Sequence, residues 1–193
     1  MKYQSYIETP IKFDKKTGLG NCQTLALERR YSDMKSMYLD EETRKKKEEQ
    51  ENIVVYRFYD LGVPQKDSEL AFGTSIVYPG KVGKEYHMTN GHFHTILNTA
   101  EIYYCQAGYG MMMMENPEGE VLYKEMRPGE VIYVPGRFAH RSINLSSTET
   151  LITFFTFRSD AGHDYGMIRE KGFRKIVVDN NGNWEIKDNP RWK

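Results

Sequence analysis

The chain has 193 residues, and its 27 basic side chains (Lys and Arg) balance its 27 acidic ones. This length suits one domain, and the balanced charge gives no overall attraction to nucleic acid or to an acidic membrane. Two cysteines are too few for a disulfide framework, and there is neither a signal-peptide pattern nor an apolar run of the roughly 20 residues that span a bilayer, so we expect a cytoplasmic protein.

Residues 1–50 are expected to form an arm and a helix that pack on the rest of the chain. Pro10, Gly18 and Gly20 disfavour helix in the first 30 residues, which we interpret as extended. A helical turn is expected around Ser32 and Asp33, and a helix over residues 40–51 has Asp40 as its N-cap. The basic cluster at residues 44–47 is interpreted as a solvated helix face with acid–base pairs, because carboxylates lie three and four residues away.

Residues 51–193 have the pattern of a mainly β fold. Turn signals rich in Pro and Gly separate many of the short β-type runs, at residues 53–59, 70–78, 84–89, 101–106, 110–114, 121–123, 131–134, 140–144 and 151–157. Many short strands with little helix between them predict a sandwich or a barrel. Residues 174–192 predict a final hairpin around Asn181-Gly182. The four methionines at 111–114 are interpreted as core packing, because alternate strand residues cannot all face one ion.

The segment 89–101 contains the strongest indication of chemistry. His92 and His94 are two residues apart, so on a strand both imidazoles lie on one face. Glu101 begins another strand-like run, and a hairpin with a turn at Asn98-Thr99 would return its carboxylate to the imidazoles. With the later His140, three imidazoles and one carboxylate would suit one divalent metal. Iron(II) is the metal we expect, while manganese(II), nickel(II) or zinc(II) would also suit these ligands.

The spacing of these residues resembles the two-part signature of the cupins. The second motif has its Gly, Pro, His and Asn at Gly129, Pro135, His140 and Asn144. The first motif has His92, His94, Glu101 and Gly108 in place, with a longer gap between the second His and the Glu. The resemblance implies a cupin barrel, that is, a double-stranded β-helix or jelly roll, over residues 51–193.

A narrower resemblance covers the chain from about residue 30 to its end. The segments 78–86, 89–94, 100–103, 139–144 and 160–166, with the tail at 171–173 and 188–193, look like the cupin-type glucose-6-phosphate isomerases. This implies a metal-dependent homodimer that interconverts glucose 6-phosphate and fructose 6-phosphate, an aldose–ketose step of glycolysis and gluconeogenesis. By matching positions, the resemblance implies metal ligands, substrate-facing residues and sugar-lining residues. The ligands would be His92, His94, Glu101 and His140; Tyr56, Ser75, Thr89, Gly91 and Tyr165 would face the substrate or its phosphate; Tyr103 and His163 would line the sugar.

The isomerisation requires a base beside C1 and C2. Glu101 is the only acid in the ligand set, and we expect it to move a proton through an enediol. A hydride shift between C1 and C2 is the rival mechanism, and the sequence does not separate the two. His163 or Tyr103 would carry the proton that opens the sugar ring. Since the chain has no P-loop, hydroxyls and backbone amides would hold the phosphate.

Three departures from the family pattern concern substrate contacts. Ser75 replaces a Thr and keeps the hydroxyl, Arg137 interrupts a Pro-Pro-aromatic run, and Phe157-Arg158 replaces Tyr-Pro. Two other classes of function stay open: a cupin dioxygenase that uses the same ligands to activate oxygen, and a non-catalytic sugar-binding cupin. We expect a small phosphosugar as the substrate, and no nucleic acid or membrane as a partner.

Overall fold

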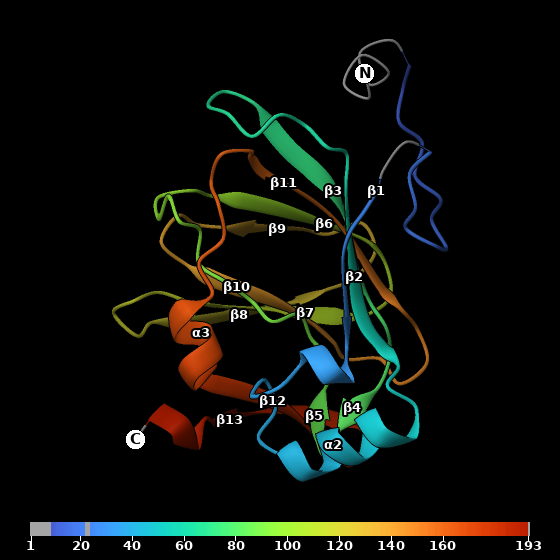
Figure 1. Cartoon of the computed structure of the whole chain (residues 1–193), viewed down its shortest axis with the longest axis vertical. Coiled ribbons are helices and arrows are strands. Elements are labelled where there is room, and N and C mark those ends of the chain that lie inside the picture. The colour runs from blue at the N-terminus through green and yellow to red at the C-terminus, as the bar shows by residue number, and fades with distance from the viewer. Residues whose placement is uncertain (1–8, 22–23, 193) are drawn as a thin grey trace.

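The computed structural model describes residues 9–21 and 24–192, and most of its elements are short strands (Figure 1). The strands are β1 (Thr24–Arg30), β2 (Val54–Asp60), β3 (Leu70–Val77), β4 (Lys81–Val82), β5 (Glu85–Tyr86), β6 (Glu101–Ala107), β7 (Gly110–Glu115), β8 (Val121–Met126), β9 (Val131–Val134), β10 (Ala139–Asn144), β11 (Leu151–Arg158), β12 (Lys175–Asn180) and β13 (Asn183–Asp188). The helices are η1 (Tyr31–Asp33), α2 (Glu41–Gln50), α3 (Gly166–Lys171) and η2 (Pro190–Trp192).

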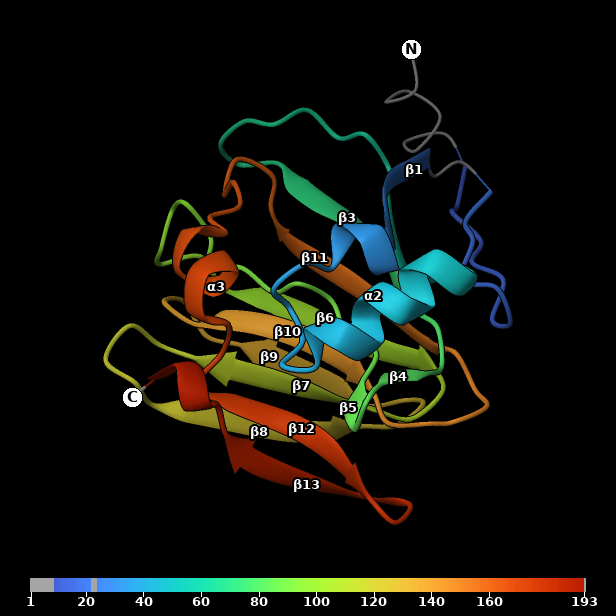
Figure 2. The ribbon, with the colours of Figure 1, turned by 60° about the horizontal axis from the view of Figure 1, so that its bottom comes forward.

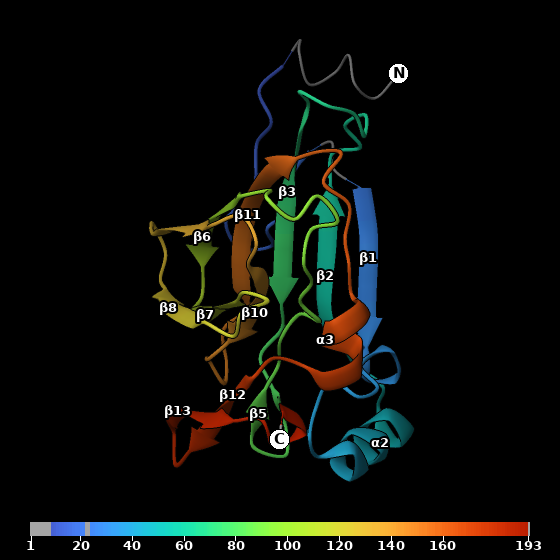
Figure 3. The same ribbon diagram turned by 90° about the vertical axis from the view of Figure 1, so that its left-hand side faces the viewer.

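One wall of the molecule is a six-stranded sheet with the order β1-β2-β3-β11-β6-β9. Figure 3 shows β1, β2, β3 and β11 side by side. The last part of the expected arm is therefore a strand, because β1 pairs antiparallel with β2 over its whole length. Further towards the N-terminus, Phe13 packs edge-on against Phe154 of β11, with ring centroids 5.7 Å apart.

The opposite wall is the smaller sheet β10-β7-β8. Residues 87–93 run beside β10 and pair with it irregularly, through bridges that join Met88 to Ile143 and His92 to His140. The expected strand at 84–89 is therefore wrong in its extent: only Glu85–Tyr86 forms a strand, and the chain then crosses to β10. The two walls enclose one core, so the fold is the mainly β, jelly-roll barrel of the cupin type.

The four methionines of β7 are all at most 1% exposed. Alternate side chains of a strand point to opposite faces, so both faces of β7 must be covered. The barrel core covers one face. Figure 1 shows β12 and β13 below β7 and β8, and β13 is the lowest strand in Figure 2. The predicted packing role of the methionines is confirmed, and so is the final hairpin, whose turn residues Asn181 and Gly182 both have positive φ.

The helix expected at 40–51 is α2, and its N-cap is Asp40, whose Oδ1 accepts from the Thr43 N–H at 2.9 Å. The expected acid–base pairs are present, since Arg44 pairs with Glu41 and Glu48 at 2.6 and 2.7 Å. Arg44 itself is not solvated, however, because it is 1% exposed. The helix α3 was not predicted. It has only six residues, and its N-cap residue Tyr165 caps no N–H; Asp164 Oδ1 accepts from the Gly166 N–H at 2.9 Å instead, so the usual N-cap pattern is missing from the sequence.

Candidate metal centre and substrate pocket

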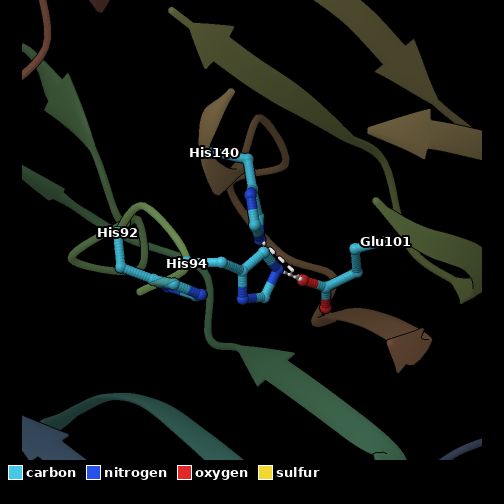
Figure 4. A group of neighbouring side chains, drawn as sticks. All are labelled: His92, His94, Glu101 and His140. Atoms are coloured by element: carbon cyan, nitrogen blue, oxygen red, sulfur yellow. Dashed lines mark hydrogen bonds and ion pairs between the residues drawn. The ribbon is translucent and has the colours of Figure 1, made fainter. Parts of the chain in front are cut away.

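Four side chains from three segments converge inside the barrel (Figure 4). His92 bridges to His140 of β10, His94 lies two residues further on, and Glu101 is the first residue of β6. Their ligand atoms all lie within 4.8 Å of one another. The expected turn exists, with the Thr99 N–H donating to the Ile96 carbonyl at 2.9 Å. The expected hairpin is wrong, however, because β6 pairs with β11 and β9 rather than with the histidine segment.

The hydrogen-bond partners of the histidines place their unprotonated nitrogens in the centre of this group. A carbonyl oxygen can only accept, so Nδ1 of His94 donates to Gly162 at 3.2 Å and Nδ1 of His140 donates to Phe138 at 3.3 Å. In the neutral rings the Nε2 atoms are then acceptors, and they lie 3.1 and 2.9 Å from the same Oε2 atom of Glu101. Three acceptors this close repel one another unless a cation lies between them.

The electrostatics of these buried groups are consistent with a bound cation. Burial raises the pKa of Glu101, but His140 and His94, when protonated and without a metal, outweigh it and lower that pKa well below its usual range; a cation bound between the same atoms acts in the same direction. Burial also lowers the pKa of His92 far below its usual value, with His140 and His163 adding to the effect. His92 is therefore neutral, and its buried Nε2 has no hydrogen-bond partner among the residues that the structure describes. Three imidazoles and a carboxylate in this arrangement fit a divalent first-row metal.

A cavity of about 250 Å³ adjoins this group. Nine of the residues singled out in the sequence line it: Tyr56, Ser75, Thr89, Gly91, His92, Tyr103, His140, His163 and Tyr165. The structure thus brings together residues that lie more than 100 positions apart in the chain. His94 and Glu101 are not among the lining residues, and they are 3% and 2% exposed. Both therefore lie behind the cavity wall.

Gly91 has a conformational reason to be glycine. Its φ is +73°, and a Cβ there would lie 2.6 Å from the Phe173 ring and 3.0 Å from the His140 carbonyl. The protein's own packing therefore requires glycine at this position, and Gly91 also lines the cavity. The neighbouring Thr89 is fixed to β10, because its N–H donates to the Ser142 carbonyl and its hydroxyl accepts from the Ser142 N–H.

The aromatic and imidazole groups at the cavity differ in burial. Tyr103 is 6% exposed, and burial followed by the charge of Glu101 raises its pKa well above the usual value. His163 lies nearer the solvent, with its ring centroid 4.3 Å from that of His92. Desolvation and then His94 lower the pKa of His163, so it is neutral at pH 7. Tyr103 is thus a proton donor, whereas His163 can accept a proton.

Comparison with known proteins gives the family. The model of the glucose-6-phosphate isomerase family matches residues 28–193. The chain belongs to this family. It is 45% identical to the glucose-6-phosphate isomerase of Thermococcus litoralis over 183 residues, 95% of each chain, and 48% identical to that of Pyrococcus horikoshii over 167 residues, 86% of this chain and 88% of the relative.

More distant matches are also found. A putative glucose-6-phosphate isomerase 1 of Rhizobium meliloti is 37% identical over 185 residues, 94% of this chain and 86% of the relative. Among solved structures, an oxalate decarboxylase of Bacillus subtilis matches 54% of this chain and 26% of its own with a TM-score of 0.43 and 25% identity. That partial likeness adds nothing to the assignment to the isomerase family.

The sequence analysis missed several residues of this isomerase-family pocket, of which Asp60, Asn90 and Ser142 are polar. Ser142 could have been found, because it lies two positions after His140 on the same strand and therefore on the same face. Asn90 lies between two residues that were singled out. Phe58 and Asp60 of β2 carry no chemical motif, and only the folded sheet places them at the cavity.

Of the departures from the family pattern, Ser75 lines this cavity, whereas Arg137, Phe157 and Arg158 do not. Phe157 is 7% exposed and packs against His94 and His163, with ring centroids 5.1 and 5.7 Å apart, so it forms an apolar wall behind the centre. Arg158 pairs with Asp160 at 2.7 Å. Arg137 pairs with Glu118. Both guanidinium groups are thus held by carboxylates rather than directed into the cavity.

Proposed function

We propose that this chain interconverts glucose 6-phosphate and fructose 6-phosphate with one divalent metal, iron(II) being the ion we expect. The observation that carries the proposal is the convergence of His92, His94, Glu101 and His140 beside a cavity lined by hydroxyls. The isomerase names of relatives that align along most of this chain support the reaction class.

The polar groups of the cavity suit a sugar phosphate. The hydroxyls of Ser75, Thr89 and Tyr165 and the backbone at Gly91 lie on its lining, and they bind the phosphate end. The sugar then extends towards His92 and His140, with C1 and C2 nearest the centre. The apolar Phe58 and Leu27 on the same lining limit the water that enters beside the sugar.

The metal, when bound, supplies Lewis-acid stabilisation of negative charge on O1 and O2 of the sugar. His163 takes the proton of the O1 hydroxyl and returns it to the ring oxygen, which breaks the bond between C1 and that oxygen. Glu101 then removes the proton from C2, and the electron pair forms the enediol. The same proton returns at C1, and the hydrogen of O2 passes to O1, with Tyr103 as the neighbouring donor.

The low pKa of Glu101 makes its carboxylate a weak base while His94 and His140 hold Oε2. Proton transfer therefore requires the carboxylate to loosen from these imidazoles and to move from behind the cavity wall towards C2 during turnover. A hydride shift between C1 and C2 does not require such movement. The two mechanisms predict different behaviour for the variant Glu101→Gln.

In Glu101→Gln, the base is lost while the size and one oxygen donor are kept. If Glu101 moves the proton, the metal-replete variant loses about 10²–10⁴-fold in kcat, and the wild type places deuterium at C1 or C2 in heavy water. If hydrogen moves as hydride, activity follows metal occupancy and the carbons carry no solvent label. Glu85→Gln is the matched control, because Glu85 is also buried but accepts from the Leu39 N–H, far from the cavity. Full turnover in metal-replete Glu101→Gln would exclude the base.

The same preparation separates the alternative classes. Turnover of fructose 6-phosphate under argon contradicts an oxygen-dependent dioxygenase. If chelation abolishes turnover, and added iron(II), manganese(II) or nickel(II) restores it without a change in circular dichroism, a non-catalytic sugar-binding cupin is excluded. A metal-free preparation that turns over normally would contradict the proposal itself.

We also propose that two copies form a cytoplasmic homodimer. β9 is an edge strand, and four large side chains lie exposed on the outer face of β6 and β9. These are Ile102, Tyr104, Val131 and Tyr133, which are 39%, 40%, 60% and 57% exposed. Such an apolar strip beside an unpaired edge supports a two-fold interface. The N-terminal arm, which contains Pro10, is a second candidate for the contact with a two-fold partner, and its Phe13 packs on its own barrel. The structure describes no helix with the length and apolar character needed to cross a membrane.

A further inference from the structure

A second cavity of about 280 Å³ lies on the other side of Asn90. Asn90 lines both this cavity and the substrate pocket, so the two share a wall. The cationic residues of the second cavity come from three distant segments: Arg29 from β1, Lys35 from the loop after η1, and Arg169 from α3. The only acidic residue on its lining is Asp33.

The charge of this cavity is not neutralised by the protein. Within residues 9–21 and 24–192, none of the three cations forms an ion pair, whereas Arg44 and Arg57 each pair with glutamates. The Asp33 carboxylate is already used, since its Oδ2 accepts from the Arg30 N–H at 2.8 Å. Three positive charges and one negative charge leave an excess of two positive charges around a space large enough for a small anion.

Arg29 is the cation of this cavity whose polar atoms are least well satisfied by the protein. Its side chain is half-buried, and its Nε is buried without a hydrogen-bond partner in the described part of the chain. It lies opposite Tyr56 in the pairing of β1 with β2, and its charge counteracts the rise that burial causes in the pKa of Tyr56. The guanidinium shares a hydrogen bond with the Tyr56 hydroxyl but has no counter-ion in the described part of the chain, so an anion that binds from outside would offset the cost of its partial desolvation.

Arg169 connects the same cavity to the substrate pocket. Its guanidinium lies 4.9 Å from the centre of the Tyr165 ring, and Tyr165 lines the pocket. An anion that draws Arg29 and Arg169 together would therefore change the surroundings of Tyr56 and Tyr165, both of which face the sugar phosphate. A planar guanidinium fork and an ammonium group are together suited to a phosphate group.

We propose that Arg29, Lys35 and Arg169 form a second anion site, separate from the substrate pocket, that binds a small phosphate-bearing anion. Binding at this site does not depend on the isomerase reaction. Its effect on sugar binding rests on the proposed function, because it acts through Tyr56 and Tyr165.

The test uses the metal-loaded full chain, with inorganic phosphate as the probe and calorimetric titration at low ionic strength as the readout. The wild type is expected to bind two phosphates, one in each cavity. Lys35→Gln and Arg169→Gln should weaken the binding of one phosphate by about tenfold or more and leave the binding of the other in place. Thr89→Val should remove the binding of that other phosphate, the one in the substrate pocket. Lys45→Gln is the control, since Lys45 is exposed on α2 and carries the same charge away from both cavities.

A single phosphate that disappears in Thr89→Val and is unaffected by Lys35→Gln and Arg169→Gln would overturn the proposal. An equal loss in Lys45→Gln would also overturn it, because the effect would then be one of net charge. Failure of the isomerase proposal would give a different result: fructose 6-phosphate is not turned over, while the phosphate binding that is sensitive to Lys35→Gln remains.

Discussion

His87 allows a quantitative prediction of how acid destabilises the protein. It is fully buried, and its neutral ring is held from both sides: the Tyr31 hydroxyl donates to Nε2 at 2.9 Å, and Nδ1 donates to the Tyr78 carbonyl at 3.1 Å. The enclosure is tight, since a Cβ at Gly80 would lie 2.4 Å from the ring. Burial lowers the pKa of His87 from 6.5 to about 4, against the opposing effect of the Tyr78 carbonyl.

The direction in which pH changes the free energy of unfolding follows from the state of the chain that binds the proton more tightly. The unfolded chain takes up a proton at His87 near pH 6.5, whereas the folded chain does so only near pH 4. The stability that this residue contributes is therefore complete above pH 6.5 and is lost as the pH falls towards 4. The interval of about 2.5 pH units, at about 1.4 kcal/mol for each, gives a loss of about 3 kcal/mol.

The assay is urea unfolding of the metal-free protein between pH 7.5 and 4, followed by the fluorescence of Trp184 and Trp192. His87→Gln keeps a donor and an acceptor but does not titrate, so its unfolding free energy should fall by about 3 kcal/mol less than that of the wild type. Any cost of the substitution at pH 7.5 cancels in this difference. His163→Gln, measured at the same protein concentration, is the control and should keep most of the acid loss. Equal acid losses in the wild type and His87→Gln would refute the reasoning.

Three further predictions concern the centre, the glycine beside it and the proposed interface. His140→Ala should lower the metal content measured by elemental analysis, and activity should fall in proportion; normal metal binding would contradict its assignment as a ligand. Gly91→Ala should destabilise the fold by about 1–3 kcal/mol in urea unfolding, because alanine disfavours a positive φ and its Cβ meets Phe173; an unchanged midpoint would show that the loop relaxes freely. Tyr133→Asp should convert the proposed dimer to monomer in light scattering, and a dimer that persists at micromolar concentration would show that the strip on β6 and β9 is not the interface.

Much of the fold follows from local patterns. The Asp40 cap, the Asn181-Gly182 turn and the alternation of apolar residues depend on neighbours in sequence, and the structure has each of them. Where pairing is made between distant segments, local patterns were less accurate. The segment after β5 pairs irregularly with β10, and α3 has at its N-cap position Tyr165, which is not a capping residue.

The site divides in the same way. The types and spacing of His92, His94, Glu101 and His140 were sufficient to indicate a metal, because ligand chemistry is a property of the residues themselves. The backbone carbonyls of Gly162 and Phe138, which belong to no motif, accept from Nδ1 of His94 and of His140. They therefore decide that the Nε2 atoms of these rings are the acceptors that meet in the centre.

The sequence alone therefore determined the fold class and the family resemblance, and it indicated the candidate ligand set. Only the tertiary structure put Glu101 behind the cavity wall, and only it brought Arg29, Lys35 and Arg169 around one space. The reason is physical: the burial of a side chain and the net charge around a cavity both depend on residues from distant segments. These residues come together only when the chain folds.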